Sequence, residues 1–286
     1  MLHDLLSSAW ETRVRSFGRD ITFAHPVRTA AVSLTGQECG LDCAHCGGHY
    51  LDDMISLEEA KCLVELGRAT SLLISGGCSP AGVVPFAAHR EELEQLARGC
   101  RLNLHVGLVN EEEAASAGKM AAVVSFDFVG DDETIREVYG LDRTVADYVR
   151  SYESLRKHAR VIPHICIGLR GGRISGEHRA LEILGRLGAP ALVFLVLIPT
   201  PGTRFAEVAP PAPAAVARIL AEARLSFPKT PIRLGCMRPG GRYRRAVDLL
   251  AVRAGVNAIV NPAPQARRLA RYLGLSAHRG EECCVL

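Results

Sequence analysis

The chain has 286 residues, 48% of them hydrophobic, and a formal net charge of +3. This length and composition are enough for one sizeable core, and the weak net charge excludes a strong field for nucleic acid or a membrane surface. The apolar run 191–198 is far too short to span a bilayer, and the N-terminus lacks the basic and apolar regions of a signal peptide. Ten cysteines, several of them within apolar helix or strand patterns, fit a reducing compartment better than a disulfide scaffold. We therefore expect a cytoplasmic protein with no nucleic-acid and no membrane partner.

Short apolar runs alternate with helical patterns along the whole chain, which is typical of parallel βα units. Helix starts carry capping patterns, of which Ser56-x-x-Glu59 is a capping box and Asn110 and Thr144 begin close matches. The eight candidate strands are residues 29–34, 71–75, 102–107, 122–128, 161–169, 191–198, 231–235 and 257–260.

Eight such units predict a single-domain α/β protein with a (β/α)8 TIM-type barrel over residues 26–272. A helical extension is expected over residues 1–25, and a cysteine-bearing tail over residues 273–286. The alternative is an open doubly wound sheet, but no glycine fingerprint for a dinucleotide follows the first strand. In a barrel, the residues that end each strand meet at one mouth, where the chemistry is expected.

Three cysteines, Cys39, Cys43 and Cys46, follow the first strand with the spacing C-x3-C-x2-C. Three thiolates hold three irons of a [4Fe–4S] cubane and leave the fourth iron open. Zinc is the alternative, and it would need His45 or His49 as a fourth ligand. The spacing resembles the motif of the radical S-adenosylmethionine (SAM) superfamily. That resemblance implies that the open iron binds SAM and that reduced ferredoxin or flavodoxin supplies the electron that cleaves it.

A glycine pair follows the second strand in Ser75-Gly76-Gly77, where backbone groups can approach a ligand closely. This segment resembles the glycine-rich SAM motif of the superfamily, with Cys78 in place of the usual acidic residue. The alternative is an ordinary βα turn. The resemblance also places His45, between two cysteines of the triplet, in the SAM-binding set.

The fourth strand carries Ser125 and Asp127 at alternate positions, which resemble the contacts to the SAM ribose in the biotin synthase group. Arg143 falls where that group places an arginine against the SAM carboxylate, although a surface arginine near a helix start is an equal alternative. The fifth strand places His164 and Cys166 on one face. His164 and, on the third strand, His105 are either ordinary barrel histidines or acid–base groups.

The resemblance to biotin synthase has an informative departure. The cysteines that hold its second cluster correspond here to Ile74, Asn103 and Ile162. Other cysteines, however, sit where a second cluster can form, because the tops of the second and seventh strands face one mouth and a tail of roughly 13 residues reaches about 40 Å. These possible auxiliary ligands are Cys78, Cys236, Cys283 and Cys284. The alternative is that Cys78 and Cys236 are buried small hydrophobes and the tail is disordered.

Segments 46–51, 73–77 and 235–239 resemble biotin synthase-like proteins, among them the subunits of the two-protein (split) lipoyl synthase. That likeness implies sulfur insertion into an unactivated C–H bond of a protein-bound octanoyl group in lipoyl cofactor biosynthesis. A lipoyl-carrier protein or octanoylated peptide and a paired radical SAM subunit are the implied partners. The alternatives are a radical SAM mutase or lyase of the methylornithine synthase type, a biotin synthase-like enzyme, and a non-catalytic zinc or cluster protein. Metal analysis separates these alternatives. Two clusters give about eight irons, one cluster gives about four, and a zinc protein gives none.

Overall fold

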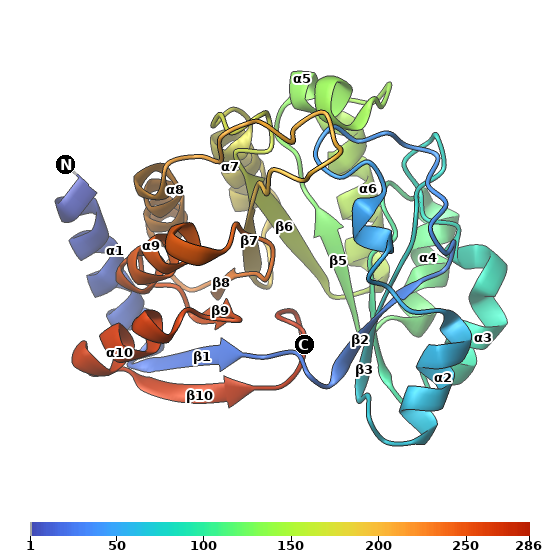
Figure 1. Cartoon of the computed structure of the whole chain (residues 1–286), viewed down its shortest axis with the longest axis horizontal. Helices are drawn as coiled ribbons and strands as arrows, with labels where there is room; N and C mark the ends of the chain where they lie inside the picture. Colours follow the sequence, from blue (N-terminus) through green and yellow to red (C-terminus); the bar gives the residue numbers. More distant parts are fainter. Residues whose placement is uncertain (1) are drawn as a thin grey trace.

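Ten parallel strands form one continuous sheet in the computed structural model, which describes residues 2–286. The strands are β1 (Asp20–Ala24), β2 (Thr29–Ser33), β3 (Ser71–Ser75), β4 (Arg101–Leu104), β5 (Val123–Asp127), β6 (Val161–Ile167), β7 (Leu192–Val196), β8 (Ile232–Leu234), β9 (Ala258–Val260) and β10 (Ser276–Gly280). Their order in the sheet is β10-β1-β9-β8-β7-β6-β5-β4-β3-β2. The sheet curls, and most of the helices lie on its outer side (Figure 1).

The helices follow the strands in the alternation that the sequence predicts. They are α1 (Leu2–Phe17), α2 (Leu57–Glu65), α3 (Arg90–Leu96), α4 (Glu111–Met120), α5 (Asp132–Thr134), α6 (Val145–His158), α7 (Glu177–Leu187), α8 (Pro213–Ser226), α9 (Gly241–Arg253) and α10 (Pro264–Tyr272), with short segments η1 (His49–Leu51), η2 (Phe86–His89) and η3 (Ile135–Tyr139). The capping boxes begin α2, α4 and α6, as predicted at Ser56, Asn110 and Thr144. Within residues 2–286, no helix is long and apolar enough to cross a membrane.

All eight predicted strands are present as β2 to β9, but the closed barrel is not confirmed. The order of the strands is linear, with β2 at one edge and β10 at the other, so the sheet is a curled half-barrel. The difference arises from β1 and β10, two strands that the sequence pattern did not reveal. Strand β1 pairs with β9 on one side and β10 on the other, and the two added strands take the place beside β9 where β2 would close a barrel.

Alternation along β5 shows which side chains face the inside of the curl. The rings of Phe126 and Phe128 pack against Tyr152 of α6, with ring centroids 5.9 and 5.7 Å apart. Because neighbouring side chains of a strand point to opposite faces, Ser125 and Asp127 face the concave side. We call this concave side the barrel interior. It carries the polar residues that the sequence analysis selected.

Residues 281–286 are the part of the expected 273–286 tail that follows β10, and from here on we call this segment the tail. It crosses between the two edges of the sheet. The amide of Arg28, just before β2, donates to the Glu281 carbonyl at 2.9 Å. Figure 1 shows the C-terminus between β1 and β10 on one side and β2 and β3 on the other. Val285 is fully buried in a small apolar cluster of its own with residues at the starts of β5, β6 and β7, which are Val123, Ile162, Ala191 and Val193. The tail therefore fills the N-terminal end of the barrel interior.

Candidate metal centre and active site

The cysteine triplet lies in the loop between β2 and η1, which is wound into tight turns. The amides of Cys46 and Gly47 both donate to the Cys43 carbonyl, at 3.1 and 2.9 Å. The Ala44 amide donates to the carbonyl of Val138 in η3 at 2.7 Å, which ties the loop to the far side of the mouth. A hydrogen bond from the Cys43 thiol lowers the pKa of Cys46 to about 7, and the same bond and burial raise the pKa of Cys43. The sulfurs of Cys43 and Cys46 are therefore neighbours, and the Cys46 thiol loses its proton more easily than an ordinary cysteine does.

Gly77 is a glycine because the loop that carries Cys39 packs on its α-carbon. A side chain there would overlap the Glu38 carbonyl oxygen and come within 2.6 Å of the Cys39 α-carbon. The Gly77 amide donates to the Thr35 hydroxyl at 2.7 Å, and that hydroxyl donates to Glu38 at 2.8 Å. The glycine pair thus supports the cysteine loop. Contact of Gly76 and Gly77 with SAM stays a prediction.

The donor set of the triplet is three thiolates, which is the set that holds three irons of an iron–sulfur cubane. Within residues 2–286, no three His, Cys, Asp or Glu side chains converge on one point as the ligands of a single ion do. A cubane does not require this convergence, because each thiolate binds a different iron. His49 is exposed and lies 3.8 Å from Asp52, so it is directed to a carboxylate. The triplet is therefore suited to the cluster that the sequence predicts.

His45 offers a nitrogen that has no protein partner. Its Nδ1 atom is buried without a hydrogen bond, and its ring stands edge-on to Tyr139 at 5.5 Å. Burial lowers the pKa of His45 to about 4, so the ring is neutral at pH 7. Buried polar atoms are nearly always hydrogen-bonded in proteins, so this nitrogen marks a place for a ligand group. That observation fits the prediction that SAM binds beside the triplet.

Asp127 and His105 form an ion pair in the barrel interior. The His105 Nε2 and Asp127 Oδ2 atoms are 3.4 Å apart, and the side chains are 33% and 42% exposed, because they face the open interior. Its position inside the curl by itself would raise the pKa of Asp127, but interactions with His105, and to a smaller extent with His164 and His45, lower it to about 2. Burial would lower the pKa of His105, and Asp127 reverses the shift and raises it. Sequence reasoning had treated Asp127 alone, because the partner lies on another strand.

Three other predicted SAM residues have different surroundings. The Ser75 hydroxyl donates to the His105 carbonyl at 3.2 Å, and the Ser125 hydroxyl donates to Asn103 Oδ1 at 2.9 Å. Ser125 is buried, so its hydroxyl already has a partner inside the sheet. Arg143 is exposed directly before α6, where its charge acts on Asp147. The structure thus brings the triplet, His45 and Asp127 together, and it gives the two serines protein partners.

The tail brings two further thiols into the barrel interior. The side-chain amide of Asn103 donates to the Cys283 sulfur at 3.7 Å, and the Cys283 amide donates to the Thr29 hydroxyl at 2.8 Å. A guanidinium nitrogen of Arg233, on β8, donates to the Cys284 carbonyl. A hydrogen bond from Cys284 lowers the pKa of Cys283 to about 6. Asn103 is one of the positions where the likeness to biotin synthase would have placed a cysteine.

The four cysteines expected to share a second cluster fall into two groups. The Cys78 carbonyl accepts from the Gly40 amide at 2.7 Å, and burial, with the charge of Cys39, raises the pKa of Cys78 to about 12. Cys78 therefore belongs beside the triplet. Cys236 follows the C-terminal end of β8, at the same end of the sheet as Cys78, whereas Cys283 and Cys284 lie in the tail at the N-terminal end of the interior. The separation follows from the route of the tail, which occupies the N-terminal end of the interior and does not cross the mouth.

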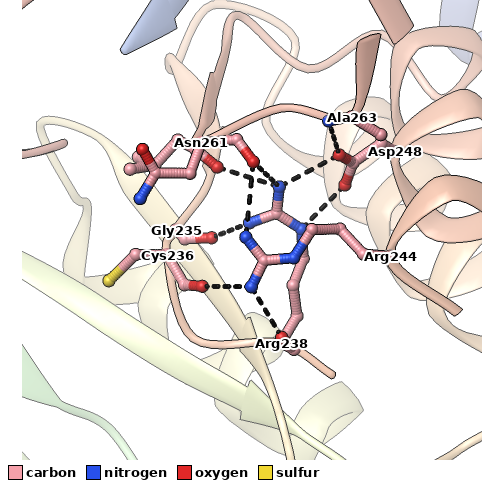
Figure 2. A network of polar contacts seen from close by, with 8 residues as sticks. Gly235, Cys236, Arg238, Arg244, Asp248, Asn261 and Ala263 are labelled. Carbon is pink, nitrogen blue, oxygen red and sulfur yellow. Dashed lines mark hydrogen bonds and ion pairs between the residues drawn. The ribbon is translucent and has the colours of Figure 1, made fainter. Parts of the chain in front are cut away.

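A buried polar network behind Cys236 was missed by sequence reasoning (Figure 2). Arg238 and Asp248 are both fully buried and pair at 2.7 Å, and Arg238 also donates to the carbonyls of Gly235 and Val260. Arg244 donates to the carbonyl of Arg238 at 2.8 Å and to that of Cys236 at 3.3 Å. The sequence analysis had singled out the segment Gly235-Cys-Met-Arg-Pro239, which contains Arg238. The partner of Arg238, Asp248, lies on α9 within an apolar pattern and was therefore not recognised.

Comparisons with known proteins agree with this geometry. No protein-family model matches the chain. A biotin synthase of Synechococcus sp. (strain JA-3-3Ab) is 27% identical over 247 residues, which cover 80% of this chain and 78% of that protein.

Among solved structures, methylornithine synthase has a TM-score of 0.70 at 16% identity and covers 97% of this chain and 89% of its own. The FeFe-hydrogenase maturase HydG from Carboxydothermus hydrogenoformans has a TM-score of 0.71 at 16% identity, covering 96% of this chain and 71% of its own. At such identities the structures establish the likeness of fold, whereas the biotin synthase is similar in sequence as well. The cysteine triplet, the curled parallel sheet and these likenesses together support the radical SAM superfamily, on its biotin synthase-like side, as the family of this chain.

Proposed function

We propose that this protein is a radical SAM enzyme that inserts sulfur into an unactivated C–H bond, with a protein-bound octanoyl group as substrate. The observation that carries the proposal is the presence of two separate sets of cysteines in one barrel interior, the triplet and the pair in the tail. The triplet lies at the C-terminal ends of the strands, and the tail thiols lie at the opposite end. The His105–Asp127 pair interacts electrostatically with both groups.

The residues of the first group hold the cluster and its ligand. Cys39, Cys43 and Cys46 would each bind one iron of a [4Fe–4S] cluster, which supplies the electron that converts SAM to methionine and a hydrogen-abstracting 5′-deoxyadenosyl radical. The partnerless His45 Nδ1 and the Asp127 carboxylate face the place that SAM would occupy.

The polar interior also decides what kind of substrate fits. The residues between the two thiol groups include an ion pair and the neutral imidazole of His164, whose pKa burial lowers to about 4. If a fatty-acyl chain lay there, the ion pair and His164 would still contact solvent or SAM. The acyl carbonyl would accept a hydrogen bond from an imidazole N–H. Reduced ferredoxin or flavodoxin is the expected electron donor.

The test is an anaerobic reaction of the reconstituted full chain with SAM, a reductant and an octanoyl-lysine peptide. We expect 5′-deoxyadenosine and a peptide that is heavier by sulfur, detected by mass spectrometry. Because the proposed enzyme resembles one subunit of a pair, the reaction is run with and without a second radical SAM subunit from the same organism. Deoxyadenosine without any sulfur-bearing product in either case would reject sulfur insertion into this substrate.

A biotin synthase-like activity is the second candidate, and the 27% identical biotin synthase favours it. Dethiobiotin therefore replaces the octanoyl peptide in a parallel reaction. Formation of biotin would establish this alternative, and product from the octanoyl peptide alone would exclude it. If neither substrate gains sulfur while the protein binds only about four irons, a mutase or lyase with a single cluster becomes the better assignment.

A further inference from the structure

We infer that the outer faces of α9 and α10 form a docking surface for an acidic protein domain that carries the octanoyl group to the mouth of the barrel interior. The inference rests on the proposed function, because the substrate proposed there defines the partner. Binding of that partner can be measured without turnover, so the two can fail separately. We call this surface the basic face, after its exposed arginines Arg242, Arg245, Arg267, Arg268 and Arg271.

The positive charge of the chain is concentrated in the segment that forms this surface. Residues 238–280 contain nine arginines, no lysine and a single acidic residue, Asp248, which is buried against Arg238. The segment therefore has a formal net charge of +8, and the rest of the chain must carry −5 to give the total of +3. A charge asymmetry of this size creates a local positive field that the small total does not reveal.

The arginines of the basic face point to solvent without a carboxylate partner. Exposed arginines elsewhere have one, as Arg90 has Glu94 on α3 and Arg186 has Glu182 on α7. Within residues 2–286, the ion pairs of segment 238–280 all use other side chains, namely Arg238–Asp248, His278–Asp20 and Arg279–Glu281. The positive charge of the basic face is therefore available to a carboxylate from another molecule.

The basic face adjoins the mouth on the side opposite the cysteine triplet. Helix α9 begins at Gly241 after β8, and α10 begins at Pro264 after β9, so both helices start at the C-terminal end of the sheet. Figure 1 shows them on the other side of the curled sheet from α2, which follows the triplet. An acyl-lysine presented from the basic face would therefore extend across the mouth towards the cluster.

The start of α9 keeps a cation where the helix itself disfavours one. The N-terminal end of a helix carries partial positive charge, so acidic side chains are favourable in the first turn and basic ones are not. Helices α2, α4 and α6 have acidic first turns, but those of α9 and α10 contain no acidic residue, and Arg242 lies in that of α9. The helix dipole thus adds to the positive potential at the mouth.

A carrier domain fits this position better than an electron donor does. Guanidiniums bind carboxylates in defined geometry, and complementary charge at the edge of an interface guides encounter and fixes orientation. A carrier needs both effects, because its acyl-lysine must enter one mouth in one direction. An electron donor would instead approach the triplet, which lies on the far side of the mouth from the basic face.

The experiment titrates the full-length protein with the octanoylated lipoyl-carrier domain of the same organism, by calorimetry at low and high salt and without reductant. Arg242→Glu/Arg245→Glu and Arg268→Glu/Arg271→Glu should each raise the Kd at low salt roughly tenfold or more, and salt should weaken wild-type binding. The matched control, Arg98→Glu/Lys119→Glu, reverses two exposed charges at the ends of α3 and α4 and should change the Kd less than about twofold. Urea unfolding checks the fold, and Glu at position 242 is favourable at a helix start.

Unchanged affinity in both arginine variants, or wild-type binding that salt does not weaken, would overturn the docking surface. Tighter binding of an oligonucleotide or of phosphatidylglycerol vesicles, lost in the same variants, would show that the surface recognises another polyanion. Slower SAM cleavage with reduced flavodoxin, at unchanged carrier affinity, would assign the surface to the electron donor. If the carrier binds through these arginines but its octanoyl group gains no sulfur, the docking surface stands and the proposed function falls.

Discussion

At the scale of single residues, Gly77 makes a sharp prediction because its α-carbon touches the cluster loop. An alanine side chain would come within 2.6 Å of the Cys39 α-carbon, so the loop must move. Overpacking of this kind costs about 1–3 kcal/mol and here displaces a ligand of the cluster. We expect Gly77→Ala to lower iron binding and SAM cleavage at least tenfold. Gly99→Ala is the control, because an added methyl group there meets nothing within 4 Å; an equal loss in both variants would contradict the argument.

The His105–Asp127 pair predicts a pKa change that nuclear magnetic resonance can follow. Asp127 raises the pKa of His105 above 6.5, whereas burial acts in the opposite direction. In Asp127→Asn both effects of the carboxylate are lost, and burial is opposed only by the smaller effect of Cys283, so the pKa of His105 should fall. The stability contributed by the raised His105 pKa is fully present below pH 6.5 and is lost as the pH rises through the folded value. The depressed Asp127 pKa contributes above pH 3.8 and is lost as the pH falls towards about 2.

A titration of the imidazole resonances in both proteins checks this prediction. A His105 pKa that does not fall in the variant would show that Asp127 is not its partner in solution.

Residue-scale reasoning from sequence succeeded where the pattern was local and failed where it was not. The triplet was found directly, because three cysteines within eight residues carry their own spacing. The pairing of Asp127 with His105 depends on how β4 and β5 are aligned, and the bond from Asn103 to Cys283 joins residues 180 positions apart. No periodicity along the chain encodes either contact.

At the scale of elements, the network behind β8 predicts a large loss of stability. The Arg238 and Asp248 side chains are both 0% exposed, and Asp248 also accepts from the Ala263 amide at 2.7 Å. Removing one partner of a buried ion pair leaves the other charge without compensation and costs about 3–5 kcal/mol. Asp248→Asn should lower the free energy of unfolding by that amount in urea titrations.

The matched control is Glu182→Gln, which breaks an exposed pair with Arg186 on α7. Surface pairs contribute between about 0 and 1 kcal/mol, so this variant should unfold almost as wild type does. Similar losses in the two variants would mean that the buried network does not stabilise the end of β8.

Element prediction from sequence was accurate for β2 to β9 and for the capped helices, because apolar periods and capping boxes are local. Strands β1 and β10 were missed for a physical reason. Every residue of β10 from Ser276 to Arg279 is exposed, so no burial pattern distinguishes it from a loop. It is a strand because β1 supplies its hydrogen bonds, and that partner lies more than 250 residues away.

At the scale of the whole molecule, the open sheet makes the tail a structural part of the barrel interior. The predicted barrel would have filled its own N-terminal end with strand side chains, as closed barrels do. Here β1 and β10 lie beside β9, where β2 would have closed the barrel. The tail contributes Val285 to the side chains that fill the N-terminal end of the interior. The same displacement places Cys283 and Cys284 at the N-terminal end of the interior, whereas a tail that reached the tops of the second and seventh strands would have crossed the mouth.

This role of the tail can be measured with one substitution. Val285 is 0% exposed and packs against Val123, Ile162 and Val193, so Val285→Ala removes two methyl groups from a filled site. The lost transfer energy and the remaining cavity together give a destabilisation of roughly 2 kcal/mol. Val27→Ala removes the same atoms from a side chain that is 66% exposed and should change the stability by less than about 0.5 kcal/mol. If urea unfolding shows equal, small effects for the two variants, the tail does not pack into the barrel in solution, and the thiols it carries are not held in the barrel interior.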